Sequence, residues 1–130
     1  MKILIVDDSR VGRNYVAKIL LTSGNIQEND IASAANGNEA LEIIKNIKTN
    51  QINLLFLDIN MPEMNGITLL EKLQQMGILN NLQVVITSSL NDKERIDKIN
   101  SLGVKYILKK PFTPEMLNNV YDIIKGLYQK

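Results

Sequence analysis

The sequence alternates five times between a short apolar segment and a longer segment with helical periodicity, and this alternation limits the fold more than any other feature. The short segments fall at 3–6, 31–34, 54–57, 84–86 and 106–108. Most are apolar at successive positions and several are β-branched, as expected for strands of a parallel sheet that is covered on both faces. We therefore predict five buried parallel strands.

The segments between and after these strands have apolar residues at every third or fourth position, which is the pattern of amphipathic helices. These helical stripes fall within 11–20, 40–47, 67–76, 96–102 and 117–127. Gly24, Gly77 and Gly103 stand where C-terminal caps are expected. Before the last stripe, Thr113 and Pro114 have the residue types of an N-cap and a first helical position.

Five strand–helix units in 130 residues predict one α/β domain over 1–130, built as a flavodoxin-like, doubly wound (βα)5 sandwich. The expected five-stranded parallel sheet has the order 2-1-3-4-5, with helices on both faces. Such sheets bind ligands beyond the carboxyl ends of their strands, near the point where the strand order reverses. The residues that follow each apolar segment are therefore the candidates for chemistry.

Composition excludes several classes of function. Lys and Arg total 15 against 14 Asp and Glu, so the net charge of +1 indicates neither a nucleic-acid surface nor a membrane surface. The chain has no Cys, which excludes disulfides and thiolate metal sites, and no His, so any phosphohistidine must come from a partner. No apolar run approaches the ~20 residues of a membrane span, and we expect a soluble, cytoplasmic protein.

Three acidic residues follow two of the predicted strands. Asp7 and Asp8 come after the first strand, and Asp58 closes the very apolar third strand. Their carboxylates would repel one another unless a cation lay among them, and Mg²⁺ prefers such oxygen ligands. Asn60 could add its main-chain carbonyl. The alternative is that these acids are solvated loop residues or helix N-caps, which is the usual role of a single Asp.

Hydroxyl and ammonium groups follow the last two predicted strands. Thr87, Ser88 and Ser89 come at the end of the fourth strand, where a hydroxyl could donate to a phosphoryl oxygen or simply cap the next helix. Lys109 and Lys110 end the fifth strand. A lysine there could neutralise the acids and later bind phosphate, although paired lysines are more often solvated. Taken together, the four strand ends predict a pocket for phosphoryl transfer to an aspartate.

Over about residues 2–127, the chain resembles the receiver domains of two-component response regulators, including the chemotaxis-type single-domain regulators. The segment 57–66, Leu-Asp-Ile-Asn-Met-Pro-Glu-Met-Asn-Gly, is its most specific part. The other matching segments are 3–9, 35–41, 84–88, and 103–112, which runs from Gly103 through Lys110-Pro111-Phe112. Five segments in the same order as in that family make a chance match improbable.

The resemblance implies a role for each residue of the acidic pocket. Asp58 matches the phosphoacceptor, Asp8 the direct Mg²⁺ ligand, and Asp7 the acid that holds the ion through water. Asn60 matches the residue whose main-chain carbonyl binds the metal.

The resemblance also implies roles on the last two strands. Ser88 matches the switch hydroxyl, because it follows the apolar strand by the family's spacing, and Lys110 matches the phosphate-binding lysine. The Lys110–Pro111 peptide bond is then expected to be cis. One position departs from the pattern: Ile107 stands where the family often has an aromatic residue, and Tyr106 is expected on the opposite face of the strand.

The implied function is a phosphorylation switch. The phosphoryl group would pass from a sensor histidine kinase, a phosphotransfer protein or a small donor such as acetyl phosphate to Asp58, with Mg²⁺ as cofactor. The protein would catalyse only its own phosphorylation and dephosphorylation. Its signal would reach a downstream protein through the face formed by 96–102, 106–108 and 117–127, which also serves for homodimers in many relatives. No output domain, nucleic acid or membrane partner is expected.

Three alternatives remain open at the level of sequence. An aspartate-nucleophile phosphatase of the haloacid-dehalogenase type needs a second acid where this chain has Asn60, because that acid protonates the leaving group. A flavodoxin-type nucleotide or flavin module shares the layer architecture, but the first turn carries Asp7 and Asp8 where a phosphate cradle needs glycines or hydroxyls. The third is an unphosphorylated scaffold that binds through its last helix.

Overall fold

The computed structural model describes residues 1–23, 26–46, 52–61, 64–89 and 92–128. Within these ranges the strands are β1 (Ile3–Val6), β2 (Ile31–Ala34), β3 (Leu54–Leu57), β4 (Gln83–Ser88) and β5 (Tyr106–Lys109). The α-helices are α1 (Arg10–Thr22), α2 (Gly37–Asn46), α3 (Gly66–Gln75), α4 (Lys93–Ser101) and α5 (Pro114–Tyr128). Two 3₁₀ turns, η1 (Glu28–Asp30) and η2 (Leu79–Asn81), precede β2 and β4.

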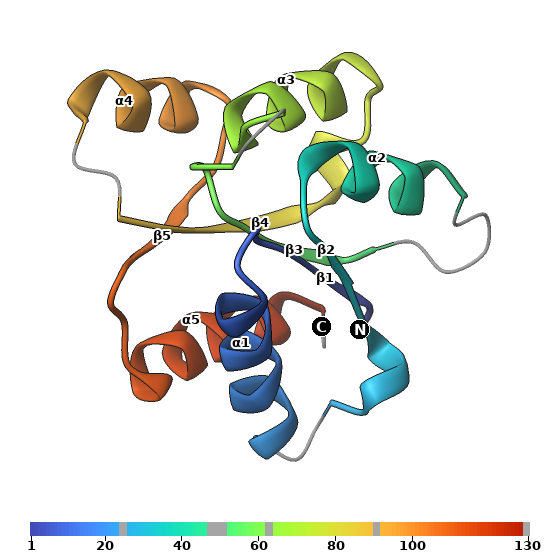
Figure 1. Ribbon diagram of the computed structural model, residues 1–130, viewed down its shortest axis with the longest axis vertical. Helices are drawn as coiled ribbons and strands as arrows, with labels where there is room; N and C mark the ends of the chain where they lie inside the picture. The colour runs from blue at the N-terminus through green and yellow to red at the C-terminus, as the bar shows by residue number, and fades with distance from the viewer. Residues whose placement is uncertain (24–25, 47–51, 62–63, 90–91, 129–130) are drawn as a thin grey trace.

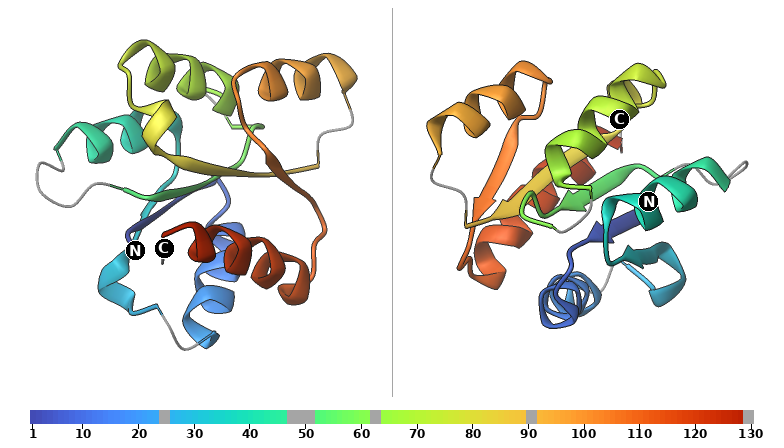
Figure 2. Two further views of the ribbon diagram at one scale, coloured as in Figure 1. Left: turned by 180° about the vertical axis from the view of Figure 1, so that it is seen from behind. Right: turned by 45° about the horizontal axis from the view of Figure 1, so that its top comes forward.

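The strands form one parallel sheet in the order β2-β1-β3-β4-β5. Helices α2, α3 and α4 cover one face, and α1 and α5 cover the other (Figure 1). Seen from behind, α1 and α5 lie side by side on their face of the sheet (Figure 2). The structure thus confirms the predicted flavodoxin-like sandwich and its strand order.

The sheet separates two apolar cores because successive residues of a strand point to opposite faces. In β3, for example, Leu55 and Leu57 pack under α2, α3 and α4, whereas Leu54 and Phe56 pack against α1 and α5. All four side chains are fully buried. The apolar run of β3 therefore serves both cores, which explains why it shows no alternation of polar and apolar residues.

Helix ends follow the sequence signals where these fall on described residues. Thr113 accepts a hydrogen bond from the N–H of Met116 at 3.1 Å, so it caps α5 as predicted. Gly77 and Gly103 have φ of +74° and +88°, the left-handed conformation that a glycine C-cap adopts. The predicted cap Gly24 and the end of the second helical stripe lie outside the described residues.

The predicted bounds of two strands and one predicted core position were wrong. β4 extends beyond the predicted 84–86 to Gln83 and Ser88, and β5 continues to Lys109, because these strands end in polar residues that still pair in the sheet. Val11, part of the first helical stripe, is 79% exposed rather than packed in a core. Among the described residues, no helix combines the length and apolarity needed to cross a membrane.

Candidate functional site

The register of the sheet brings the acidic residues together. Val6 of β1 pairs with Leu57 of β3, so Asp7 and Asp58 leave adjacent strands at the same level. The Asp58 N–H donates to the Val6 carbonyl at 2.9 Å, which continues the pairing one residue further. Carboxylate oxygens of Asp7, Asp8 and Asp58 all lie within 4.8 Å of one another. Asp7 and Asp58 are only 3% and 5% exposed, whereas Asp8 faces solvent.

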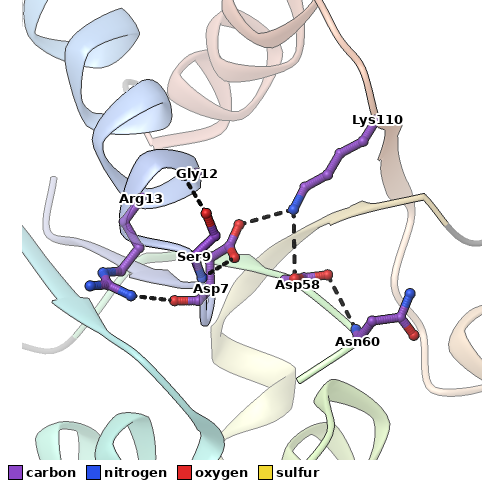
Figure 3. A network of polar contacts seen from close by, with 7 residues as sticks. All are labelled: Asp7, Ser9, Gly12, Arg13, Asp58, Asn60 and Lys110. Atoms are coloured by element: carbon purple, nitrogen blue, oxygen red, sulfur yellow. Dashed lines mark hydrogen bonds and ion pairs between the residues drawn. The ribbon is translucent and has the colours of Figure 1, made fainter. Parts of the chain in front are cut away.

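The start of α1 holds Asp7 in place. The Ser9 N–H donates to Asp7 Oδ1 at 2.9 Å, and the Arg13 guanidinium donates to the Asp7 carbonyl at 2.7 Å (Figure 3). Ser9 also caps the helix by accepting from the Gly12 N–H at 3.1 Å. A Cβ on Gly12 would lie 2.5 Å from Asp7 Oδ2, so a glycine here lets the helix approach the carboxylate.

Lys110 reaches both buried acids from the end of β5. Its Nζ lies 3.0 Å from Asp7 Oδ2 and 3.6 Å from Asp58 Oδ2 (Figure 3). Burial alone would lower the pKa of Lys110, but the hydrogen bond to Asp7 and the charges of Asp58 and Asp7 outweigh it and raise that pKa above its usual value. Lys110 is therefore a fixed positive charge between the two carboxylates.

The carboxyl group of Asp58 lies in an environment that disfavours its charge. Burial raises the pKa of Asp58 to about 6, and the negative charges of Asp7 and Asp8 add to the shift, while Lys110 and the Asn60 N–H oppose it. Unlike Asp58, the exposed Asp8 remains in contact with water. The site thus holds a buried carboxylate whose negative charge needs more cationic support than Lys110 provides.

Neighbouring residues of β4 place their hydroxyls on opposite faces of the sheet. Ser88 and Thr87 are 1% and 2% exposed. Ser88 shares the face of Val84 and Ile86, which pack under α2, α3 and α4, whereas Thr87 shares the face of Val85 and points towards α1 and α5. The carbonyl of Ser88 accepts from the Lys110 N–H at 2.9 Å, so β4 and β5 hold these two residues next to each other.

None of the predicted site residues serves as an N-cap of α1, α3 or α4, so the helix-cap alternative for them does not hold. α1 is capped by Ser9, α3 by Asn65 and α4 by Asp92. Asp7 and Asp58 instead accept hydrogen bonds from the N–H groups of Ser9 and Asn60, two residues further along. These contacts orient the two carboxylates at the edge of the sheet.

Asn60 links the acidic pocket to α4. Its N–H donates to Asp58 Oδ1 at 3.2 Å, and its side-chain oxygen accepts from Arg95 at 3.0 Å. Gly66, at the start of α3, packs closely against this loop. A Cβ at that position would lie only 2.8 Å from the Asp58 carbonyl oxygen, so the close approach requires a glycine. Pro62 and Glu63, which belong to the most specific predicted motif, lie outside the described residues.

A cavity of about 550 Å³ opens beside Asp7 and Lys110. Its walls include Val11 and Tyr15 of α1 and Phe112, which follows β5. The Tyr15 hydroxyl donates to the Phe112 carbonyl at 2.8 Å, and the centroids of the two rings are 5.6 Å apart. This contact ties α1 to the segment after Lys110 and gives the acidic pocket an apolar border.

The Lys110–Pro111 peptide bond is cis, as the resemblance implied. Ile107 is 36% exposed, while Tyr106 packs against the core on the α1 and α5 side. The two side chains thus point to opposite faces of β5, which confirms the predicted alternation. No aromatic side chain stands at position 107.

The donor set fits a hard divalent cation. Two buried carboxylates and one exposed carboxylate converge within 4.8 Å, and oxygen ligands with access to water are what Mg²⁺ prefers. Burial raises the pKa of Asp58, and a cation beside this carboxylate would favour its charged form. Asp7, Asp8 and Asp58 could therefore hold a metal ion.

The geometry speaks against two of the alternatives from the sequence. Position 60 carries an amide whose oxygen accepts from Arg95, so it cannot act as the general acid of a haloacid-dehalogenase phosphatase. The turn before α1 is lined by acids, and its Gly12 N–H is already bonded to Ser9. A nucleotide or flavin phosphate would meet negative charge there.

Three residues of the site were missed by sequence reasoning. Arg13 and Gly12 depend on how α1 is rotated against β1, and the sequence offers no signal for that beyond their place in the first turns. Arg95 contacts Asn60 from 35 positions away, which a single sequence does not reveal. Asp7, Asp8, Asp58, Asn60, Ser88 and Lys110 all lie at the carboxyl edge where they were predicted.

The family model for the response regulator receiver domain matches residues 3–122. The chemotaxis protein CheY homolog of Campylobacter jejuni is 29% identical over 97% of this chain and 93% of that protein. Chemotaxis protein CheY1 of Helicobacter pylori is 30% identical over 97% of this chain and 98% of that protein. The solved structure of CheY4 from Vibrio cholerae superposes with a TM-score of 0.80 at 25% identity, covering 95% of this chain and 97% of that one.

Proposed function

The chain belongs to the response regulator receiver domain family, and on that premise we propose that Asp58 is its phosphoacceptor. As a CheY-like receiver, the protein acts in two-component signalling. The observation that carries the residue assignment is the placement of Asp58: a buried carboxylate whose Oδ2 lies 3.6 Å from the Lys110 ammonium, at the centre of the acidic cluster.

Asp7, Asp8, Asp58 and the main-chain carbonyl of Asn60 would hold a Mg²⁺ ion in this proposal. When bound, the ion would neutralise negative charge on the transferring phosphoryl oxygens. The acidic cluster supports this assignment, because three carboxylates within 4.8 Å of one another are stabilised by a cation among them.

The chemistry assigned to the chain itself is a displacement at phosphorus. An oxygen of the Asp58 carboxylate attacks, a P–O bond forms, and the P–N bond to the histidine of a kinase or phosphotransfer protein breaks. Lys110 is already within 3.6 Å of that carboxylate and can move onto a phosphoryl oxygen. The Ser88 hydroxyl is the proposed donor to a second oxygen. Attack by water later releases inorganic phosphate and restores the carboxylate.

The proposed output surface is the edge formed by α4, β5 and α5 (Figure 1). Exposed apolar side chains of two of these elements support it: Ile107 on β5, and Met116, Ile123 and Leu127 on α5. A downstream protein is the proposed partner, and a homodimer through the same edge is the alternative assembly. The single receiver domain would act in the cytoplasm and turn over no substrate other than its own phosphoryl group.

The linkage that holds the phosphoryl group tests the assignment. Incubation with phosphoramidate, a small P–N donor, and Mg²⁺ should label the protein, and hydroxylamine should remove the label because it cleaves acyl phosphates but not phosphate esters. Lys110→Ala should slow the labelling. Lys109→Ala should not, because the ion pairs with Asp7 and Asp58 are made by Lys110. A hydroxylamine-resistant label would place the phosphate on a hydroxyl group and contradict the proposal.

A further inference from the structure

Arg95 is connected to Asp58 through two hydrogen bonds. Its guanidinium donates to Asn60 Oδ1 at 3.0 Å, and the Asn60 N–H donates to Asp58 Oδ1 at 3.2 Å. Among the described cationic side chains, Arg95 is the one hydrogen-bonded to the loop after Asp58. The role proposed above for Asp58 and Lys110 does not use it.

The charges of the site leave room for a second cation. Asp7, Asp8 and Asp58 carry three negative charges, which Lys110 and a divalent cation would balance. A phosphoryl group brings the charge on Asp58 close to −2 and adds three strong acceptor oxygens. Roughly one negative charge is then unbalanced in a site that already disfavours charge.

The helix that carries Arg95 has few side chains in the core. Ile99 is the only residue of α4 that is fully buried; Ile96 and Leu102 are partly buried against the same core. Arg95 itself is half-exposed, with Asp92 Oδ2 at 3.8 Å as a second partner. Its present acceptor, the amide oxygen of Asn60, is neutral, whereas a phosphoryl oxygen carries negative charge and would attract the guanidinium more strongly.

We propose that Arg95 is a second cationic ligand of the phosphoryl group on Asp58, and that it leaves Asn60 when this group is attached. The inference rests on the proposed function of Asp58. Through this exchange the first turn of α4 follows the state of Asp58 directly. The coupling needs no aromatic side chain at position 107, where this chain has Ile107.

The test uses trifluoroberyllate, formed from Be²⁺ and fluoride, as a stable mimic of the phosphoryl group, at saturating Mg²⁺. Fluorine NMR reports the bound species and its affinity. Arg95→Ala should weaken trifluoroberyllate binding about tenfold, the effect expected for one charge-assisted hydrogen bond. Arg95→Lys should recover most of that loss, and the affinity for Mg²⁺ alone should be the same in all variants.

Lys98→Ala is the matched control. Lys98 lies one turn further along α4, is as exposed as Arg95, and pairs with Glu71 at 3.5 Å instead of with the Asp58 loop. Its loss should change trifluoroberyllate affinity less than twofold. Thermal unfolding followed by circular dichroism confirms that each variant folds.

Two results would overturn the inference. One is equal trifluoroberyllate affinity in Arg95→Ala and Lys98→Ala. The other is a parallel loss of Mg²⁺ affinity in Arg95→Ala, since Arg95 would then act only by holding the Asn60 loop. Failure of the wild-type protein to bind trifluoroberyllate would instead contradict the assignment of Asp58 as phosphoacceptor.

Discussion

At the scale of single residues, the site depends on charges held where burial opposes them. Asp58 and Asp7 are almost fully buried, and Lys110 is the cation that contacts both. An isolated buried carboxylate would take up a proton. The pKa of Asp58 is raised for this reason, although Lys110 opposes the shift. A carboxylate that is short of positive charge is well suited to accept cations and a phosphoryl group in turn.

The raised pKa of Asp58 predicts how stability depends on pH without metal. Between the usual pKa near 3.8 and about 6, the folded protein holds a proton that the unfolded chain has lost. Stability contributed by this group is therefore present below that window and is lost as the pH rises through 6. Urea unfolding in EDTA should show Asp58→Asn more stable than the wild type at pH 7.5, by about 1–3 kcal/mol.

The same comparison at pH 4.5 is the control. There the carboxyl group of the folded wild type is largely protonated, so the advantage of Asp58→Asn should shrink to about a third of its value at pH 7.5. If the difference in unfolding free energy stays constant between the two pH values, ionisation of the Asp58 carboxylate is not what destabilises the wild type.

At the scale of elements, the first turn of α1 is fitted to the acidic pocket through Gly12. A Cβ at this position would lie 2.5 Å from Asp7 Oδ2, so Gly12→Ala must displace the carboxylate or the helix. We expect Gly12→Ala to lower the affinity for Mg²⁺ about tenfold or more, because a displaced Asp7 no longer converges with Asp8 and Asp58. Isothermal titration with MgCl₂ measures this.

Gly126→Ala is the matched control within α5. A Cβ on Gly126 would meet no atom within 4 Å, so the substitution should raise the free energy of unfolding by about 0.5–1 kcal/mol through helix propensity alone. Its Mg²⁺ affinity should equal that of the wild type. Equal Mg²⁺ affinities in the two alanine variants would show that the close approach of Gly12 to Asp7 is unimportant.

The strands also show what sequence reasoning could and could not supply. β1, β2 and β3 were predicted with their observed bounds, and in β1 and β3 the apolar run ends at an Asp that leaves the sheet. In β4 the pairing continues through Thr87 and Ser88, whose polarity ended the predicted strand too early. The carboxyl ends of parallel strands lie at one edge of the sheet, so the proximity of Asp7, Asp58 and Lys110 could be predicted from the sequence.

Helix rotation and loop contacts could not be predicted in the same way. The orientation of α1 decides that Arg13 meets the Asp7 carbonyl while Val11 stays exposed. The contact of Arg95 with Asn60 joins α4 to the loop after β3, 35 positions earlier in the sequence. Both depend on packing between elements, which leaves no periodic signal in a single chain.

At the scale of the whole molecule, a bound cation should stabilise the fold, because the unfolded chain does not assemble the acidic cluster. At Mg²⁺ concentrations 100 times the dissociation constant, the gain in unfolding free energy should be about 2.7 kcal/mol. Thermal unfolding in MgCl₂ and in EDTA measures it as a shift in Tm.

Asp8→Asn should remove most of this shift while leaving the Tm in EDTA nearly unchanged, since Asp8 is exposed and lies within the predicted ligand set. Asp97→Asn, which removes an exposed acid from α4, should keep the full shift. If both variants kept it, the ion would bind elsewhere.

Phosphorylation of Asp58 is the central claim, and intact-mass spectrometry after incubation with acetyl phosphate and Mg²⁺ tests it most directly. The wild-type protein should gain the mass of one phosphoryl group, and the gain should be absent without Mg²⁺ and in Asp58→Ala. An adduct that persists in Asp58→Ala, or its complete absence from the wild type, would contradict this account and favour a receiver fold used only as a binding scaffold.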